Sequence, residues 1–600
     1  MTLTHTFHIP VMGIGYTIDT PIKVAHLGIS SVLSLGDDML LERLREHYAQ
    51  KFNFDFTPIS KSDIDKRAKR ITEYLNLVNK IVNVKFQELR NSVFEKATEL
   101  RKYMEMLPDV SSLKQEYNRM LQEQEPLTRK RLQDSIKKSI QPGSIDVNVM
   151  TKLDRINYNS KGEAYPVEYN DAHAAVRGFA NSELQSSLVL SAGLSPRLFS
   201  YIATFESFFP DKNGNLTKKI ILKVSDYRSA LVQGKMLAKK GIWVSEYRIE
   251  SGLNCGGHAF ASEGYTLGLI LEEFKQNRQD LIDTTHQLLN EALKSIGRPV
   301  LNTPLEMKIS AQGGVGNFNE HRFLSEYYRI DSVGWGTPFL LVPEVVNIDK
   351  ENLSLLTNAK EEDLYLSGIS PLGVPFNSVR GNSKDKQRDE RIKKGKPGSP
   401  CKSQFLKLYN TEFTEKPICE ASSQYQKSKI QELNAMHITD VREYQKRYNK
   451  ITEKTCICTG LVRTAYSENK ILKSSDEDGV SICPGPNIAY FSKISSLEEM
   501  VGHIYGRINI LNDTYRPNMF MKEFGMYVDY IEKEIAECSI NEMTDKQIKH
   551  FNTFRDNLLA GIDYYKTTLP LFDTHTQWKS ELEHYNQRLQ LLNIPTHITA

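Results

Sequence analysis

Short apolar runs alternate with stretches of helical spacing along much of the chain. This alternation is typical of repeated β-α units that build a parallel sheet. Eight such units close into a barrel, with the loops at the carboxyl ends of the strands forming a site. The predicted strands are FHIPVMGIG (7–15), ISSVLSL (29–35), SIDVNVM (144–150), SSLVLSAG (186–193), KKIILKV (218–224), IWVSEYRIESG (242–252), LEMKISAQGG (305–314) and IDSVGWGTPFLL (330–341).

Between residues 37 and 143 this alternation stops, and a polar sequence carries apolar residues at helical spacing. The stretch 63–107 predicts one long helix, and a second helix follows across PDVSS. We interpret the segment as a helical hairpin inserted into the barrel. Its expected role is packing or oligomerisation. The alternative is a direct part in the chemistry of the protein. The seam of the long helix consists of Ile64, Ile71, Leu75, Val78, Val82, Phe86, Leu89 and Val93.

The predicted fold class is therefore α/β, a (β/α)8 TIM barrel with an inserted helical hairpin and a mostly helical, cysteine-containing C-terminal region. The barrel takes residues 1–36 and 144–346, the hairpin 37–143, and the C-terminal region 347–600. Within the last part, KDKQRDERIKKGKPGSP (384–400) is charged and then rich in Pro and Gly, which predicts a mobile surface loop.

Composition narrows the class of protein. The chain has 77 basic and 74 acidic residues, a net charge of +3, so no overall field favours nucleic acid or an anionic membrane. The N-terminus carries no signal-peptide pattern, and no apolar run approaches the length of a membrane span. We therefore expect a cytoplasmic protein. Seven cysteines, an odd number, favour reduced thiols or metal ligands over a disulfide framework.

Glycines follow the last two predicted strands, in SAQGGVG (310–316) and GWGTP (334–338). Glycine lets backbone N–H groups approach phosphate oxygens without a Cβ in the way. A phosphate site between strands seven and eight is the usual arrangement of this fold. The two motifs together therefore predict a phosphate-bearing ligand. A third glycine-rich strand end, IESGLNCGGHAFASEG (249–264), places a histidine directly after a Gly-Gly pair.

These motifs resemble the nitronate monooxygenase (2-nitropropane dioxygenase-like) flavoproteins and the related flavin-dependent enoyl reductases. The stretches that carry the resemblance are 9–36, IDVNVM, 229–258 and, most specifically, KISAQGGVGNFNEHRFLSEYYRIDSVGWGTPFL (308–340). The resemblance implies FMN, with its phosphate on the last two strand ends, where Thr337 adds a hydroxyl donor. The cofactor-binding residues that it implies are Met12, Gly13, Asn148, Lys223, Gly256, Gly257, Gln312, Gly313, Gly314, Gly334, Gly336 and Thr337.

The resemblance also points to catalytic residues. His258 matches a histidine that is catalytic or positions substrate, and an imidazole exchanges protons near neutral pH. A structural role, capping the strand end, is the alternative. The family has Glu-Ala before Gly-Gly-His, whereas this chain has Asn254 and Cys255, which puts nitronate itself in doubt as substrate. Cys255 is a small filler or a reactive thiol. Lys223 stabilises the reduced flavin or is a surface lysine.

Five cysteines of the C-terminal region lie beside proline, glycine or small residues, as ligand loops around a metal require. Four thiolates can hold an iron–sulfur cluster or a zinc ion. The Cys-x-Cys spacing is unusual for zinc, so zinc is the less expected of the two. Buried reduced cysteines are the alternative. The candidate ligands are Cys401, Cys419, Cys456 and Cys458, with Cys483 in reserve.

The function that follows is an FMN-dependent oxidoreductase that oxidises a small carbon acid or reduces an activated double bond. It exchanges electrons with oxygen, NAD(P)H or a partner protein. The alternative is a non-catalytic barrel that binds or assembles through its helical insertion, for example as a homo-oligomer. The sequence does not specify the substrate.

Overall fold

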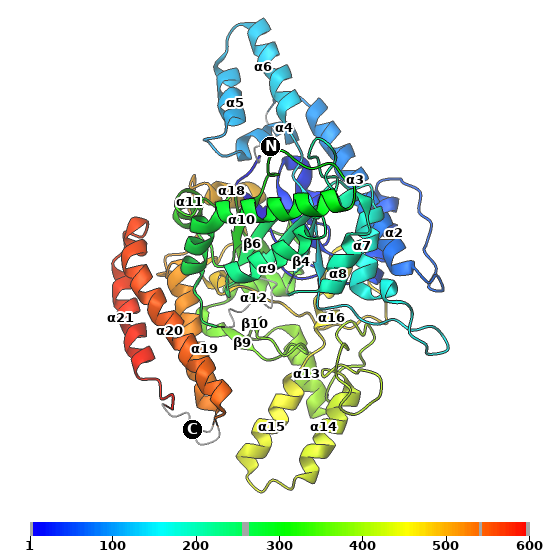
Figure 1. Cartoon of the computed structure of the whole chain (residues 1–600), viewed down its shortest axis with the longest axis vertical. Coiled ribbons are helices and arrows are strands. Elements are labelled where there is room, and N and C mark those ends of the chain that lie inside the picture. Colours follow the sequence, from blue (N-terminus) through cyan, green and yellow to red (C-terminus); the bar gives the residue numbers. More distant parts are fainter. Residues whose placement is uncertain (1–3, 96, 192, 255–262, 539–542, 596–600) are drawn as a thin grey trace.

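The computed structural model describes residues 4–95, 97–191, 193–254, 263–538 and 543–595. Eight parallel strands form a closed barrel in chain order, because the first strand pairs with the eighth. The predicted fold class is thereby confirmed, with flanking helices and a helical C-terminal region (Figure 1). The strands are β1 (Phe7–Ile9), β2 (Ser30–Ser34), β3 (Ile145–Met150), β4 (Ser187–Ser191), β5 (Lys219–Val224), β6 (Val244–Glu250), β7 (Lys308–Gln312) and β8 (Ser332–Gly334).

Side chains alternate between the two faces of each barrel strand. In β5, Ile220 and Leu222 belong to the large hydrophobic core between strands and helices. The residue between them, Ile221, belongs instead to a small separate cluster with Val32 and Val189, which lies inside the barrel. The rest of the interior is polar. The outer faces of the strands therefore pack in an apolar core, whereas the side chains inside the barrel are largely hydrogen-bonded.

The helices that cover the barrel follow the strands in sequence, as repeated β-α units require. They bury an apolar stripe against the outer faces of the strands. They are α1 (Thr20–Val24), α7 (Asp171–Asn181), α8 (Pro196–Ile202), α9 (Tyr227–Ala238), α10 (Leu267–Ser295) and α11 (Phe318–Glu326), and a 3₁₀ turn, η4 (Thr337–Leu341), follows β8.

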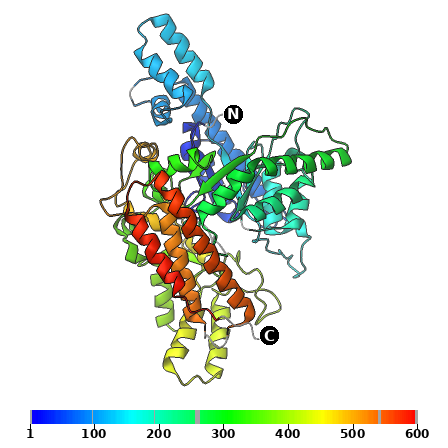
Figure 2. The same cartoon turned by 60° about the vertical axis from the view of Figure 1, so that its left-hand side comes forward.

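The long segment between β2 and β3 crosses over outside the sheet, since these two strands pair directly. Its α3 packs against α2 and α7, while α5 and α6 lie side by side and project from the barrel (Figures 1 and 2). The helices of this segment are α2 (Asp38–Lys51), α3 (Lys66–Asn91), α4 (Glu99–Met106), α5 (Ser112–Gln122) and α6 (Pro126–Ser139).

The single long helix expected over 63–107 is corrected by the structure. Helix α3 ends at Asn91, because Ser92 has extended backbone angles and its hydroxyl donates to the carbonyl of Leu89. The middle of the predicted seam is buried, but its two ends are not: Ile64 is 50% exposed and Val93 is 52% exposed. Helical spacing alone did not locate these ends.

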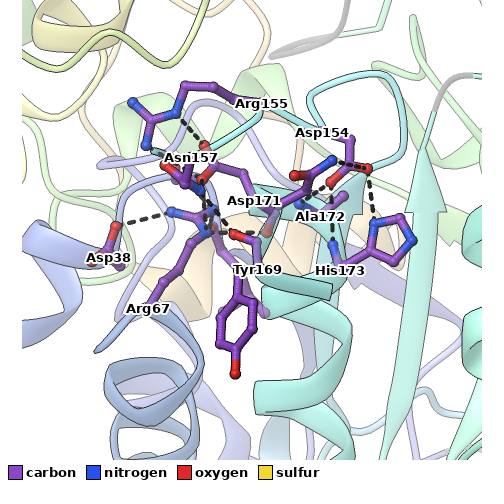
Figure 3. A network of polar contacts seen from close by, with 12 residues as sticks. Asp38, Arg67, Asp154, Arg155, Asn157, Tyr169, Asp171, Ala172 and His173 are labelled. Atoms are coloured by element: carbon purple, nitrogen blue, oxygen red, sulfur yellow. Dashed lines mark hydrogen bonds and ion pairs between the residues drawn. The ribbon is translucent and has the colours of Figure 1, made fainter. Parts of the chain in front are cut away.

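A polar network ties the inserted segment to the carboxyl ends of β2 and β3 (Figure 3). Arg67 of α3 donates to Asp38 at 3.0 Å, to the carbonyl of Leu35 at 2.9 Å and to the carbonyl of Asp171 at 3.1 Å. Arg155, in the loop after β3, forms an ion pair with Asp171 at 3.0 Å. The insertion therefore braces one rim of the barrel.

The C-terminal region adds an antiparallel hairpin, β9 (Leu364–Ser367) and β10 (Phe376–Val379), and a set of helices. The loop expected over 384–400 is largely helical instead: α13 begins there because Asn382 caps it by accepting from the amide of Asp385. The helices are α12 (Lys350–Asn358), α13 (Ser383–Lys393), α14 (Ser423–Ala435), α15 (Val441–Glu453), α16 (Ile457–Gly460), α17 (Arg463–Glu468), α18 (Leu497–Ile504), α19 (Met519–Glu537), α20 (Asp545–Thr568) and α21 (Gln577–Gln590).

The C-terminal helices α19 to α21 pack beside the barrel, and α14 and α15 project at the end opposite α5 and α6 (Figures 1 and 2). Of the helices in the described residues, none combines the length and the apolar character that a membrane crossing requires.

The burial of the α3 seam gives a first test. Ile71 is fully buried and lies against Gly178 of α7. Ile71→Ala should lower the free energy of unfolding by about 2–5 kcal/mol, because it leaves a cavity between the two helices. Chemical denaturation followed by circular dichroism measures the loss. The matched variant Ile64→Ala, half-exposed just before α3, should change it by no more than about 0.5 kcal/mol. Equal losses in both variants would contradict the observed seam.

Candidate functional site

The carboxyl ends of the barrel strands carry a compact group of polar side chains. Lys223 is the last residue but one of β5, Glu250 ends β6 and Gln312 ends β7, all on the inner face. One oxygen of Glu250 accepts from the Lys223 ammonium at 2.7 Å, from the Gln312 amide at 2.7 Å and from the Asn254 amide at 2.6 Å. The strand ends thus hold a lysine beside a carboxylate at the mouth of the barrel.

Below this group, the barrel interior is filled by charged and polar residues. Arg248 contacts Glu246 at 2.7 Å and Asp146 at 3.6 Å, and Ser310 donates to Glu246 at 2.5 Å. Burial alone would raise the pKa of Glu246, but the charge of Arg248 and the hydrogen bonds from Ser310 and Arg248 together outweigh burial and lower that pKa. Burial raises the pKa of Asp146, which is farther from the guanidinium. The interior is therefore a built ion-pair network.

His8 connects the interior network to the mouth. Burial, followed by the nearby charge of Arg248, lowers the pKa of His8 to about 3, so the imidazole is neutral. Its Nδ1 lies 2.9 Å from the Ser332 hydroxyl and its Nε2 lies 3.4 Å from the Gln312 carbonyl oxygen. Since that oxygen only accepts, Nε2 carries the proton, and the Ser332 hydroxyl donates to Nδ1. Gln312 thus links His8 to Glu250.

The glycines after β7 adopt backbone angles that other residues avoid. Gly313 has φ of 110° and Gly314 has φ of 83°. A Cβ on Gly314 would lie 2.7 Å from the Leu253 side chain, and one on Gly313 would lie 2.9 Å from the amide nitrogen of Asn254. The turn after β7 therefore packs tightly against the turn after β6, which by itself requires glycine.

Backbone donors gather at the ends of β7 and β8. Within the part of the chain that the structure describes, the amide N–H groups of Gly314, Gly336 and Thr337 have no hydrogen-bond acceptor. The Thr337 hydroxyl accepts from the amide of Gly485 at 3.0 Å, which leaves its own proton to donate. Donors without acceptors fit the phosphate of a bound nucleotide or flavin. The predicted phosphate position is thus chemically suited to an anion.

The other predicted cofactor residues lie at or near the same mouth. Asn148 is buried on the inner face of β3, and Gly334 ends β8 above Gln312 and His8. Met12 is buried in the loop after β1, and Gly13 there has φ of 146°. The predicted residues Cys255, Gly256, Gly257 and His258 lie outside the described residues.

The C-terminal region holds the loops of the mouth in place, which the sequence did not reveal. Glu523 of α19 accepts from the Ser251 hydroxyl at 2.6 Å, and from the amides of Gly252 at 3.3 Å and Leu267 at 2.7 Å. Burial raises the pKa of this carboxyl. These bonds hold both flanks of the β6–α10 connection.

A second clamp holds the loop after β7. Glu320 of α11 accepts from the amide of Gly316 at 2.8 Å and forms an ion pair with Arg516 at 2.7 Å. Arg516 also donates to the carbonyl of Gly314 at 2.7 Å. The side chains of Glu320 and Arg516 are 1% and 5% exposed, so the pair is buried.

A cleft of about 1200 Å³ leads toward this mouth from the C-terminal region. The β9–β10 hairpin, α15, α19 and α21 form its walls. It reaches Leu253 in the loop after β6. It also reaches Pro484 and Pro486, which flank Gly485, and the amide of Gly485 donates to Thr337 after β8. Both lysines and carboxylates line it, so its charge favours no single ligand class.

The five predicted metal ligands do not form the expected centre. Cys401 contacts Cys419, and Cys456 contacts Cys458. Cys483 is buried on a different segment, two residues before Gly485. Among the described residues, no three His, Cys, Asp or Glu side chains are arranged to hold one metal ion. The described residues therefore do not support the predicted metal centre.

Comparison with known proteins adds little to this picture. No family model and no curated protein matches the chain. The enoyl reductase domain of MlnA from the macrolactin biosynthesis cluster of Bacillus amyloliquefaciens is 14% identical, with a TM-score of 0.34 over 64% of this chain and 86% of that one. FabK from Thermotoga maritima is 12% identical, with a TM-score of 0.27 over 68% and 85%.

A nitroalkane oxidase from Streptomyces ansochromogenes is 9% identical, with a TM-score of 0.32 over 84% of this chain and 94% of that one. Likenesses at this level assign no activity to the chain. The function has to be argued from the residues at the mouth of the barrel.

The buried ion pair of the second clamp can be tested directly. Glu320→Gln should lower the free energy of unfolding by about 3–5 kcal/mol, because it leaves the Arg516 charge buried without its partner. Urea denaturation measures the loss. Glu326→Gln is the control on the same helix, since Glu326 faces Arg322 at 3.8 Å on the surface and should cost at most about 1 kcal/mol. A small effect of Glu320→Gln would show that the clamp is not needed.

His8 gives a prediction about pH. Its pKa is 6.5 in the unfolded chain and about 3 in the folded one, so the unfolded state binds more protons between these values. Stability should therefore fall as the pH drops below 6.5, with His8 contributing about 1.4 kcal/mol per pH unit. His8→Asn should remove this part of the slope between pH 6.5 and 5, measured by denaturation at each pH. Between pH 7.5 and 8.5 the variant and the wild type should share one slope. An unchanged acidic slope would refute the buried neutral imidazole.

Proposed function

We propose that the protein is an FMN-dependent oxidoreductase whose active site is the mouth of the barrel. The observation that supports this most is the set of donors at the ends of β7 and β8 that have no acceptor among the described residues. The amides of Gly314, Gly336 and Thr337, with the Thr337 hydroxyl, would hold the phosphate of FMN. Gly313 would shape the same turn.

FMN, when bound, would supply the acceptor for a hydride or for electrons. The residues of the chain would orient it and manage charge. Lys223, held by Glu250 at 2.7 Å, would place a positive charge beside the electron-rich edge of the ring. Asn148, Gln312 and Gly334 would line the inner side of the pocket, and Met12 and Gly13 would close it from the loop after β1.

Proton transfer would fall to His258, supported by its place after the Gly-Gly pair of the sequence motif. Gly256 and Gly257 would let the backbone pass close to the ring. Cys255 would be a filler or a second reactive group. His258→Ala should leave flavin binding intact and slow flavin reduction by substrate about 10²–10⁴-fold. Anaerobic stopped-flow measures the reduction.

The proposed substrate is a small carbon acid or an activated double bond, and the cleft of about 1200 Å³ would be its route to the mouth. The flavin would exchange electrons with oxygen, NAD(P)H or a partner protein. The finer family assignment, a nitronate monooxygenase-like enzyme and hence a monooxygenase, rests on the sequence motifs. The proposed location is the cytoplasm.

A second function is favoured by one observation. Val110 and Leu127 in the arm of α5 and α6 are 84% and 70% exposed, as an apolar contact surface would be. A barrel without chemistry could assemble into homo-oligomers through this arm. Purified protein that is colourless and cannot be reconstituted with FMN would favour this function.

The phosphate site can be tested without knowing the substrate. Thr337→Val removes a hydroxyl donor and should weaken FMN binding about tenfold or more, since a hydrogen bond to a charged group contributes about 1.5–3 kcal/mol. Fluorescence quenching of added FMN measures the affinity. Gly314→Val is less informative, because its Cβ would also meet Leu253.

The control is Thr285→Val, which removes a buried hydroxyl that donates to the carbonyl of Leu281 on α10, away from the mouth. It should leave FMN affinity unchanged. If the wild type binds no FMN, or if Thr337→Val binds it as tightly as the wild type, the proposed site is wrong.

A further inference from the structure

Two cations lie side by side on the inner face of the barrel. Lys223 of β5 is in register with Arg248 of β6, and both side chains point inward. A buried cation without a partner is costly, so each of the two needs a carboxylate of its own. The alternation of side chains in β6 supplies both, because Glu246 and Glu250 flank Arg248 on the same face.

Each carboxylate serves one of the two cations. Glu246 contacts Arg248 at 2.7 Å, and Glu250 contacts the Lys223 ammonium at 2.7 Å. Among the residues that the structure describes, no other carboxylate forms an ion pair with Lys223. The side chains of Lys223 and Glu250 are 14% and 9% exposed, so water and salt screen this pair little. The charge of Lys223 at the mouth is therefore opposed by one carboxylate.

The donors around Glu250 all meet at the same oxygen. Oε1 accepts from Lys223 at 2.7 Å, from Gln312 at 2.7 Å and from Asn254 at 2.6 Å. Within the described part of the chain, the other oxygen, Oε2, accepts no hydrogen bond, and it is not enclosed either. The carboxylate is thus anchored through one oxygen and leaves the other open at the mouth.

The amide of Gln312 is fixed in the orientation that donates to Glu250. The imidazole of His8 donates from Nε2 to the Gln312 carbonyl oxygen at 3.4 Å. The Ser332 hydroxyl, 2.9 Å from Nδ1, fixes this tautomer of His8. The amide nitrogen of Gln312 therefore faces Glu250, and this chain of bonds holds the carboxylate from inside the barrel.

We propose that Glu250 is a positioning residue that holds Lys223 at the mouth and opposes its charge, and that it thereby sets how readily a bound flavin takes up electrons. This inference rests on the proposed function, because it needs FMN beside Lys223. It adds a residue that neither the sequence motifs nor the resemblance indicated.

The direction of the effect follows from charge alone. Reduction adds two electrons and one proton to the flavin, which leaves it with one additional negative charge. A nearby cation therefore favours the reduced form, and a nearby anion favours the oxidised form. Lys223 and Glu250 act in opposite directions, so their effects largely cancel. A flavin that takes electrons from one molecule and passes them to another needs such a balance.

Glu250→Gln removes the charge and keeps the shape. Because all three donors meet at one oxygen, the amide oxygen of glutamine can accept the same three bonds. The variant should shift the equilibrium toward reduced FMN about tenfold or more, since a unit charge within about 10 Å has an effect of this size inside a protein. Tenfold corresponds to about 30 mV for a two-electron couple. Titration against a reference redox dye at pH 6, where lysine stays protonated, measures the shift.

Lys223→Met removes the opposite charge and should shift the same equilibrium about tenfold or more toward oxidised FMN. The double variant, with Lys223→Met and Glu250→Gln, lacks both charges and should lie within about threefold of the wild type. It leaves no buried charge without a partner, so it keeps the test valid if Glu250→Gln folds poorly. Its difference from Lys223→Met alone then isolates the charge of Glu250.

Two further variants separate charge from structure. Glu263→Gln is the matched control, because Glu263 is an exposed carboxylate in the same connection between β6 and α10. Water screens its charge, so the equilibrium should not change. Glu250→Asp keeps the charge but shortens the side chain, and it should stay closer to the wild type than Glu250→Gln does. A purely structural role predicts the reverse order.

The affinity for FMN is measured first in each protein, by fluorescence quenching. Bound FMN with the same equilibrium in the wild type and Glu250→Gln would overturn this inference and leave the proposed function standing. A larger shift in Glu250→Asp than in Glu250→Gln would do the same. A wild-type protein that binds no FMN would overturn both, so the two failures can be told apart.

Discussion

The buried charge of Arg248 is the interaction around which the barrel is arranged. An unpaired guanidinium inside a barrel would be very costly, so its neighbours on β3, β6 and β7 have to supply carboxylates and hydroxyls. Asp146, Glu246 and Ser310 do so. This requirement fixes which residues of three strands face inward, and therefore also the register that brings Glu250 and Gln312 to the mouth.

The mouth itself depends on residues far away in the chain. The turns after β6 and β7 are glycine-rich in sequence. Glu523 binds the first of these turns, and Arg516 with Glu320 binds the second. Because both clamps are buried and made of hydrogen bonds, with an ion pair in the second, they hold the turns by direction as well as by contact. The C-terminal region thus shapes the site in addition to covering it.

Much of the fold was predictable because strands buried on both faces leave a strong pattern in the sequence. All eight strands were located, since runs such as KKIILKV are apolar enough to stand out. The two ends of α3 were not located, because Ile64 and Val93 continue the helical spacing although they are exposed. The helix α13 was also missed, since its charged sequence carries no apolar stripe.

In the candidate site, the glycines and the threonine at the ends of β7 and β8 were predictable, because they directly follow predicted strands. Glu250 was missed, although the alternation in VSEYRIE puts Glu246, Arg248 and Glu250 on one face of β6. Glu523 and Arg516 could not be found, because nothing in the sequence around them indicates which distant turn each side chain will bind. The pairing of the cysteines likewise depends on packing between segments.

The clamp of Glu523 on Ser251 has a consequence for synthesis. The two residues are 272 positions apart, so the turn after β6 lacks its main acceptor until α19 has left the ribosome. A nascent chain that already holds all eight strands would therefore carry an unfinished mouth. The mouth is therefore completed only late in translation, after most of the chain has been made.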